Sequence, residues 1–212
     1  SNVLEHLGLK FRQAEDFHKK CLDEAGICIL HAPLFHPAMK SVAPIRKSLA
    51  LKTFFNMLGP MVNPSNPQKQ MVGVYSLQLL RLYAYLYQKQ QKSYAIVHAL
   101  DGYDEISLTQ SAKVVTHKED RLIKAEDFNV KTHTPEAIFG GNKVEEASKI
   151  FMNVLNNSGT EQQVNTVCAN AAVAISVSKD IDLKEAFDQA EISLKSGMAL
   201  QKFKVLKELS RQ

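Results

Sequence analysis

The chain has 212 residues, of which 45% are hydrophobic and 23% charged, the composition of an ordinary globular protein with one large domain or two small ones. No apolar run approaches the length of about 20 residues that a membrane-spanning helix needs, and the N-terminus lacks the apolar stretch of a secretory leader, so we expect a cytoplasmic protein with no membrane partner. The formal net charge of +4 is spread along the chain, which argues against nucleic acid as a partner, because nucleic-acid-binding proteins gather their cations on one face.

The first part of the chain predicts helices and one short strand. A short N-terminal helix is expected, with Asn2 as its cap. A second helix is predicted over residues 13–25, ending at Gly26, since glycine commonly ends helices. The apolar run "ICIL" at 27–30 is interpreted as a short buried strand, and the pattern becomes helical again over 37–51.

The middle of the chain predicts strand, helix and strand, followed by two further strands. The run "QMVGVY" at 70–75 is rich in β-forming residues, and "YAIVHAL" at 94–100 is continuously apolar, as in a strand covered on both faces. Such a unit predicts two parallel strands joined by a helical crossover. Residues 112–117 and 121–128 are interpreted as an antiparallel pair. Between the first two strands, helical spacing joins Leu79, Leu80, Tyr83, Leu86 and Tyr87.

The last third of the sequence is helical in pattern. Apolar residues recur on one face from 144 to 155, and residues 161–177 are apolar nearly all round, which predicts a deeply buried helix. Asp182 and Glu185 have the spacing of a capping box at the start of a final helix, which Gly197 is expected to bend or interrupt. The alternation of strands and helices predicts an α/β fold.

A compact acidic segment, "DGYDEISLT" at 101–109, directly follows the predicted strand at 94–100. Ligands of α/β sheets bind beyond the carboxyl ends of the strands. Asp104 and Glu105 are adjacent carboxylates in this segment, and magnesium is usually bound by one or two carboxylates together with water and substrate phosphates. A solvated acidic loop would have the same sequence, so the residues alone leave both interpretations open.

A second unusual segment is "HPAMKSVAPIRKSLALKTFFNMLGPMVNP" at 36–64. Arg46 carries a fixed positive charge on a planar fork of donors, which suits a carboxylate or a phosphate. Gly59 permits a close approach of backbone to a ligand. On the residues alone, a surface arginine is the favoured explanation of Arg46, and a plain loop is the alternative for Gly59.

Several long motifs, in one order along the whole chain, resemble the anthranilate phosphoribosyltransferase family. The first two are "LHAPLFHPAMKSVAPIRKSL" and "TFFNMLGPMVNP". They are followed by "QMVGVY", "HALDGYDEISLT", "NAA" at 170–172 and "SGMAL" at 196–200. So many motifs in sequence are far more specific than any one short pattern.

This resemblance implies a fold and an assembly. The expected fold is the large α/β domain of a nucleoside-phosphorylase-like protein, with a central mixed sheet flanked by helices and with remnants of a small helical domain. Residues 1–55 would contain the helices of the small domain, and residues 56–212 the C-terminal part of the α/β domain. The full-length enzyme is expected to be a homodimer.

The resemblance also implies an activity in tryptophan biosynthesis. Phosphoribose would pass from 5-phosphoribosyl 1-diphosphate to the amine of anthranilate, with Mg²⁺ as cofactor and pyrophosphate as the leaving group. Carried over by position, Arg46 matches the arginine at the anthranilate carboxylate, and Asp104 and Glu105 match the acidic pair that binds magnesium on the donor. No catalytic base is assigned, because the aromatic amine is already neutral. The other positions carried over to the anthranilate site are Gly59, Pro60 and His36.

The chain departs from the family pattern at its beginning. Family members carry N-terminal helices and a Gly-Thr-Gly-Gly-Asp loop that are not found here, so we expect a C-terminal portion of the enzyme, inactive by itself. Two other functions remain open on the residues alone. One is a nucleic-acid-binding relative with the same fold, and the other is a pyrimidine nucleoside phosphorylase.

Overall fold

The structure is a computed structural model in which residues 1–35, 59–90 and 92–212 are described. The helix expected over 37–51 lies outside these residues, and so does the domain boundary expected between 55 and 56, which stays a prediction. The chain divides into two compact units, each described below by itself. Unit 1 comprises Ser1–Asn66, Asn142–Lys149 and Met198–Gln212, and unit 2 comprises Pro67–Gly141 and Ile150–Gly197.

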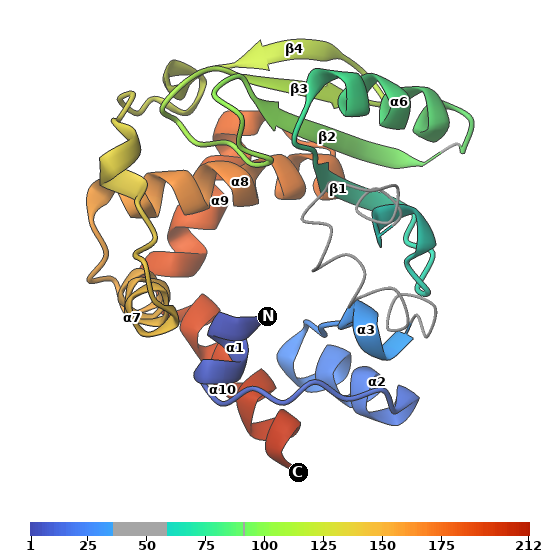
Figure 1. The fold of residues 1–212 in the computed structure, drawn as a ribbon, viewed down its shortest axis with the longest axis vertical. Coiled ribbons are helices and arrows are strands. Elements are labelled where there is room, and N and C mark those ends of the chain that lie inside the picture. The colour runs from blue at the N-terminus through green and yellow to red at the C-terminus, as the bar shows by residue number, and fades with distance from the viewer. Residues whose placement is uncertain (36–58, 91) are drawn as a thin grey trace. The chain divides into compact units, whose positions relative to one another are not determined.

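Unit 2 contains a four-stranded mixed sheet with the strand order β1-β2-β3-β4 (Figure 1). Its strands are β1 (Lys69–Gly73), β2 (Ser93–Ala99), β3 (Ala112–Thr116) and β4 (Asp120–Ile123). The first two strands are parallel, with Gly73 opposite Val97, whereas β2–β3 and β3–β4 are antiparallel. The predicted α/β fold with a mixed sheet is therefore confirmed.

The last predicted strand is shorter than expected. It ends at Ile123, and the 3-10 helix η2 (Ala125–Phe128) follows it. A carboxylate oxygen of Asp127 accepts a hydrogen bond from the backbone N–H of Lys124 at 2.7 Å. This local bond favours a turn over an extended backbone, so the strand expected as far as residue 128 was wrong over its second half.

Helices cover the two faces of the sheet (Figure 1). The helix α6 (Leu77–Gln88) joins β1 to β2 and packs on one face, mainly against β2 and β3. Its N-terminus is capped by Ser76, whose hydroxyl accepts a hydrogen bond from the backbone N–H of Leu79 at 3.2 Å. Of the apolar stripe predicted from spacing, four residues are buried in the helix, namely Leu79, Leu80, Tyr83 and Tyr87.

The opposite face of the sheet is covered by α8 (Glu161–Lys179), which packs on β1 and β2 and against α9 (Leu183–Lys195). The expectation that α8 is buried all round was wrong, because Val167 is 47% exposed. The buried side chains of α8 are small or medium-sized, and most of its other residues are half-buried or exposed. The buried residues of α8 are Cys168, Ala169, Ala172 and Val173.

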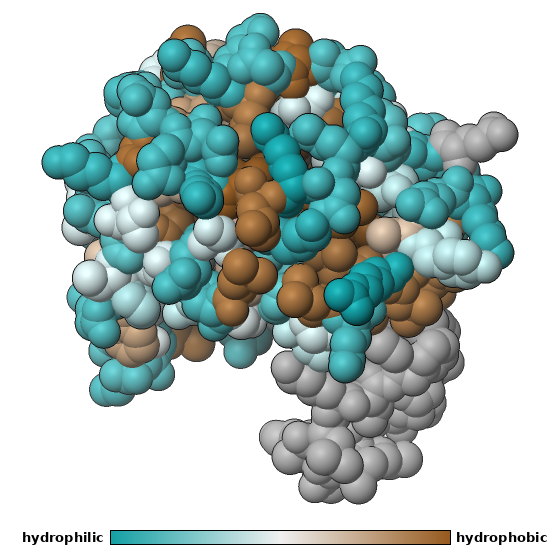
Figure 2. Space-filling model, turned by 90° about the horizontal axis from the view of Figure 1, so that it is seen from above, coloured by the Kyte–Doolittle hydropathy of each residue, from teal (hydrophilic) through white to brown (hydrophobic). Residues whose placement is uncertain are grey.

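Apolar side chains also remain at the surface of unit 2. In the view of Figure 2, hydrophobic atoms gather in patches between polar side chains. Among the exposed apolar residues are Leu82 and Tyr85 of α6 and Leu122 of β4. Single exposed apolar residues are normal on a protein surface, so we assign no role to them.

The bounds of the helix at 144–155, the start of α9 and the break at Gly197 agree with the sequence prediction. A carboxylate oxygen of Asp182 accepts hydrogen bonds from the backbone N–H groups of Lys184 and Glu185 at 2.9 and 3.0 Å, which caps α9. Gly197, with φ +77°, separates α9 from α10 (Met198–Arg211). The helix predicted from 144 to 155 is α7 (Val144–Leu155), and the 3-10 helix η3 (Pro135–Ile138) precedes it.

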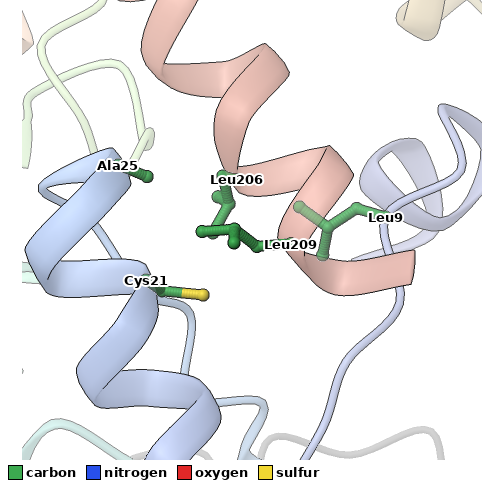
Figure 3. Close-up of a cluster of buried hydrophobic side chains, with 5 residues drawn as sticks. All are labelled: Leu9, Cys21, Ala25, Leu206 and Leu209. Atoms are coloured by element: carbon green, nitrogen blue, oxygen red, sulfur yellow. The ribbon is translucent and has the colours of Figure 1, made fainter. Parts of the chain in front are cut away.

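Unit 1 contains α1 (Asn2–His6), α2 (Glu15–Ala25), α3 (Ala32–Phe35), the 3-10 helix η1 (Gly59–Val62) and α10. Side chains of α2 and α10 meet in a buried cluster (Figure 3). Gly26 ends α2 in the left-handed conformation, with φ +75°, as predicted. The members of the buried cluster are Leu9, Cys21, Ala25, Leu206 and Leu209.

Two expectations for unit 1 were wrong. Ser1, not Asn2, precedes the first helical residue, and its side chain makes no capping hydrogen bond. Residues 27–30 form no strand, and Ile27 is 47% exposed. The four strands found among the described residues all pair within unit 2, so this apolar run has no neighbouring strand to bind its backbone groups.

In the part of the chain that the structure describes, no helix is long and apolar enough to cross a membrane.

Candidate functional site

The acidic segment predicted at residues 101–109 lies at the carboxyl edge of the parallel strands in unit 2. Because β1 and β2 are parallel, their carboxyl ends lie at the same edge of the sheet. The chain leaving β1 is bonded to β2 at this edge, where the N–H of Val74 donates to the carbonyl oxygen of Val97 at 2.9 Å. The ring nitrogen Nδ1 of His98 and the carbonyl oxygen of Val74 are 2.8 Å apart.

Asp104 lies directly against the backbone of β1 at this edge. A side chain at Gly73 would overlap the carbonyl oxygen of Asp104, since a Cβ atom built there meets the oxygen and carbon of that carbonyl group. Only glycine therefore permits this approach of loop to strand. The sequence at β1 thus determines how closely Asp104 can approach the sheet.

Asp101 braces the loop from within. Its carboxylate accepts hydrogen bonds from the hydroxyl of Ser107, at 3.2 and 3.3 Å, and from the hydroxyl of Thr109. The backbone N–H of Thr109 donates to the Ser107 hydroxyl at 3.2 Å. Between them, Leu108 adopts a left-handed conformation with φ +60° and is 1% exposed. Such a conformation is unfavourable for leucine and persists only where its surroundings hold it in place.

Contacts from outside the loop hold its second half. The backbone N–H of His133 donates to the carbonyl oxygen of Leu108 at 3.1 Å, and its ring Nε2 lies 3.0 Å from the hydroxyl of Thr166 on α8. That hydroxyl also donates to the carbonyl oxygen of Ser107 at 3.4 Å. Asn170, one turn further along α8, bonds to the backbone of Ile106. These residues from α8 and the η2–η3 connection received no functional role from the sequence.

The pKa values of Glu105 and His133 are shifted in opposite directions. Although Glu105 is exposed overall, partial desolvation of its carboxyl by the surrounding protein raises the pKa of that group, and the charge of neighbouring Asp104 raises it further. Burial lowers the pKa of His133, while a backbone hydrogen bond at Lys131 and the charge of Glu161 partly oppose this shift. The carboxylates of Asp104 and Glu105 therefore repel each other when both are ionised, and a bound cation would reduce that repulsion.

The residues at this edge fit a magnesium ion of the kind bound together with a substrate. Both Asp104 and Glu105 are exposed, so their oxygens are accessible to a ligand. No group of three or more His, Cys, Asp or Glu side chains suited to a metal occurs among the described residues, so the described part provides no complete cage for an ion. Magnesium characteristically uses one or two carboxylates, water and substrate phosphates, and the pair matches that requirement.

The other residues predicted for the site are elsewhere in the chain. Gly59 and Pro60 begin the 3-10 helix η1 in unit 1, and no described atom lies within 4 Å of the place where a Cβ of Gly59 would be. Arg46 and His36 lie outside the described residues. The roles of all four residues at an anthranilate site stay predictions.

Comparison with known proteins supports the resemblance seen in the motifs. Residues 1–200 match the sequence profile of a family described as "Glycosyl transferase family, a/b domain". The chain belongs to this family. Within this glycosyl transferase family, it is 54% identical over 211 residues to the anthranilate phosphoribosyltransferase of Christiangramia forsetii, and 53% identical over 210 residues to that of Flavobacterium psychrophilum. The alignments cover 100% and 99% of this chain and 64% of each relative.

Solved structures from the same family have the same fold. The anthranilate phosphoribosyltransferase of Thermus thermophilus superposes with a TM-score of 0.90 at 28% identity, covering 100% of this chain and 64% of that one. The Saccharomyces cerevisiae enzyme, solved in complex with PRPP and Mg, gives a TM-score of 0.90 at 26% identity, covering 99% and 60%. The chain thus spans less than two thirds of the length of these relatives, between 60% and 64%.

Replacing Gly73 by alanine should displace the acidic loop. The new methyl group would meet the backbone of Asp104, and overpacking of this kind typically costs about 1–3 kcal/mol. We expect Gly73→Ala to lower the free energy of unfolding by that amount in urea denaturation. We also expect faster amide hydrogen exchange in residues 101–109. Gly140→Ala is the matched control, because open space surrounds its Cβ position; equal stability of the two variants would contradict the close approach.

The lowered pKa of His133 predicts a loss of stability in acid. Between the folded and the unfolded pKa, the unfolded chain binds more protons than the folded chain, so the stability contributed by neutral His133 is complete above about pH 6.5 and falls as the pH decreases. We expect His133→Gln to unfold in urea with a smaller loss of stability between pH 7 and pH 5 than the unchanged protein. Parallel pH dependences of the two proteins would show that this histidine is not the titrating group.

Proposed function

We propose that this chain forms part of an anthranilate phosphoribosyltransferase. The reaction is the transfer of phosphoribose from 5-phosphoribosyl 1-diphosphate to the amine of anthranilate, which gives N-(5-phosphoribosyl)anthranilate and pyrophosphate in tryptophan biosynthesis. The observation that carries the proposal is an acidic pair, Asp104 and Glu105, braced at the carboxyl edge of the sheet in a chain 54% identical to an enzyme of this name. Structures of the yeast enzyme with PRPP and Mg and with 4-fluoroanthranilate support the choice of substrates.

The cofactor in this proposal is Mg²⁺, held by Asp104 and Glu105. When bound, the ion would offset negative charge on the diphosphate. The contribution of the chain is to keep the two carboxylates at a fixed edge of unit 2, with Gly73 behind Asp104 and α8 behind the residue after Glu105. Such preorganisation lowers the cost of assembling the donor at the site.

The aromatic acceptor is assigned to the segment around Arg46. In this proposal the guanidinium of Arg46 would hold the carboxylate of anthranilate by two parallel hydrogen bonds, which would orient the amine. Gly59, Pro60 and His36 are proposed to line the passage by which anthranilate reaches it. No side chain acts as a strong base, because the attacking amine is neutral, so catalysis depends on positioning and electrostatics.

The relatives are longer than this chain, and we propose that the whole length is needed for turnover. The matched part is 64% of the relatives' length, and the remaining third would provide the glycine-rich loop for the diphosphate and the surface of a homodimer. The activity is therefore assigned to the full-length enzyme.

The direct test of the proposed function is consumption of anthranilate by the full-length enzyme. Anthranilate fluorescence should decrease only when both 5-phosphoribosyl 1-diphosphate and Mg²⁺ are present. Phosphorolysis of thymidine without any consumption of anthranilate would instead indicate a pyrimidine nucleoside phosphorylase and would refute the proposal.

Replacement of Arg46 by alanine should affect the KM for anthranilate much more than the KM for the donor. Loss of one partner of a charged, hydrogen-bonded pair commonly costs about 2 kcal/mol or more, which corresponds to roughly 30-fold in affinity. We therefore expect Arg46→Ala to raise the KM for anthranilate about 30-fold while changing the KM for the donor little. Lys47→Ala, which removes the adjacent cation, serves as the control. Equal increases in both KM values would contradict the assigned role.

A further inference from the structure

One side chain of α8 binds both backbone polar groups of a single loop residue. The side-chain oxygen Oδ1 of Asn170 accepts a hydrogen bond from the backbone N–H of Ile106 at 2.9 Å, and its nitrogen Nδ2 donates to the carbonyl oxygen of Ile106 at 2.8 Å. The same nitrogen donates to the carbonyl oxygen of Thr166, one turn earlier in α8, at 2.9 Å. Asn170 is half-buried and Ile106 is 1% exposed.

This arrangement requires a carboxamide of the length of asparagine. An aspartate at position 170 would retain the acceptor for the N–H of Ile106 but would place a second acceptor against the carbonyl oxygens of Ile106 and Thr166. An alanine would leave the same backbone groups without these partners, and unpaired buried polar groups are costly. The residue is therefore specified by hydrogen bonding and not only by space.

The clamped residue is the direct neighbour of the acidic pair. Ile106 follows Glu105 in the chain, so the clamp fixes the peptide group that joins the two residues. The carbonyl group of Asp104, which belongs to the peptide that joins the pair, rests against Gly73. The peptide between the two acidic residues is thus held by β1, and the peptide after them by α8.

We propose that Asn170 is a positioning residue for cation binding, which rests on the proposed function. The Asn170 carboxamide holds Ile106 and thereby sets the orientation of Asp104 and Glu105, so that the affinity of the pair for a divalent cation depends on a side chain that does not touch the cation. Groups that orient metal ligands in this way commonly change metal affinity by about 10- to 100-fold when they are altered.

The test uses Mn²⁺ alone as the probe, because carboxylate and water ligands accept Mg²⁺ and Mn²⁺ alike. Free Mn²⁺ is followed by electron paramagnetic resonance while the unchanged chain and the Asn170→Asp and Asn170→Ala variants are titrated. Asn165→Asp, the same substitution at another half-buried position of α8, is the matched control. Amide hydrogen exchange of residues 101–109 is measured in the same proteins.

We expect both Asn170 variants to bind Mn²⁺ at least about tenfold more weakly than the unchanged chain and to exchange faster at residues 101–109. Asn165→Asp should match the unchanged chain in both measurements. Folded Asn170 variants that bind Mn²⁺ as tightly as the unchanged chain would overturn the inference, whether or not the loop exchanges faster. Should these variants fail to fold, Asn170→Gln keeps the carboxamide but lengthens the side chain by one methylene, which displaces the groups that bond to Ile106. Unchanged Mn²⁺ affinity in that variant overturns the inference.

Asp104→Asn and Glu105→Gln distinguish a failure of this inference from a failure of the proposed function. If these two variants lose Mn²⁺ and the Asn170 variants do not, the acidic pair binds the cation and only the positioning role of Asn170 is refuted. If they bind Mn²⁺ like the unchanged chain, the acidic pair is not the cation site, and the metal assignment of the proposed function is refuted together with the inference.

Discussion

The parallel pairing of β1 with β2 determines where the acidic loop of unit 2 can lie. Parallel strands place both carboxyl ends at one edge, so the segment leaving β2 returns across the end of β1. At that crossing, the backbone of Asp104 occupies the space that a side chain at Gly73 would need. A backbone approach of this closeness can be made only where one partner lacks a side chain.

The loop at this edge satisfies its backbone groups through side chains instead of through a sheet or a helix. The side chains of Ser107, Thr166 and Asn170 supply or accept the hydrogen bonds that the backbone of an irregular segment would otherwise lose on burial. These bonds allow Leu108 to remain in an unfavourable left-handed conformation. The rigid part of the loop thus adjoins the two carboxylates, which remain exposed and repel each other.

Much of unit 2 could be predicted from local patterns, because the determining information was local. A run of β-forming residues indicated β1 and a continuous apolar run indicated β2, while the spacing of Asp182 and Glu185 indicated the start of α9. The prediction of a strand at 27–30 was wrong. The composition of this run suits a strand, but a strand also needs a pairing partner, which can be distant in sequence. In α8, hydrophobicity alone did not reveal which side would be covered. The acidic pair was proposed as a site from its position after a strand, and its role stays a prediction. Asn170 received no role from the sequence, since its partner Ile106 lies 64 residues away.

That separation in sequence also bears on the order in which the chain acquires its structure. During synthesis, the acidic pair leaves the ribosome well before position 170 does, so the loop emerges without the helix that will fasten it. Contacts between such distant segments form late in folding, because the entropy of closing a long loop is lost before the new contacts contribute any stabilising free energy. The proposed cation site is therefore completed only once nearly the whole of unit 2 has been made, and a nascent chain that stops short of α8 would carry both carboxylates without a fixed arrangement.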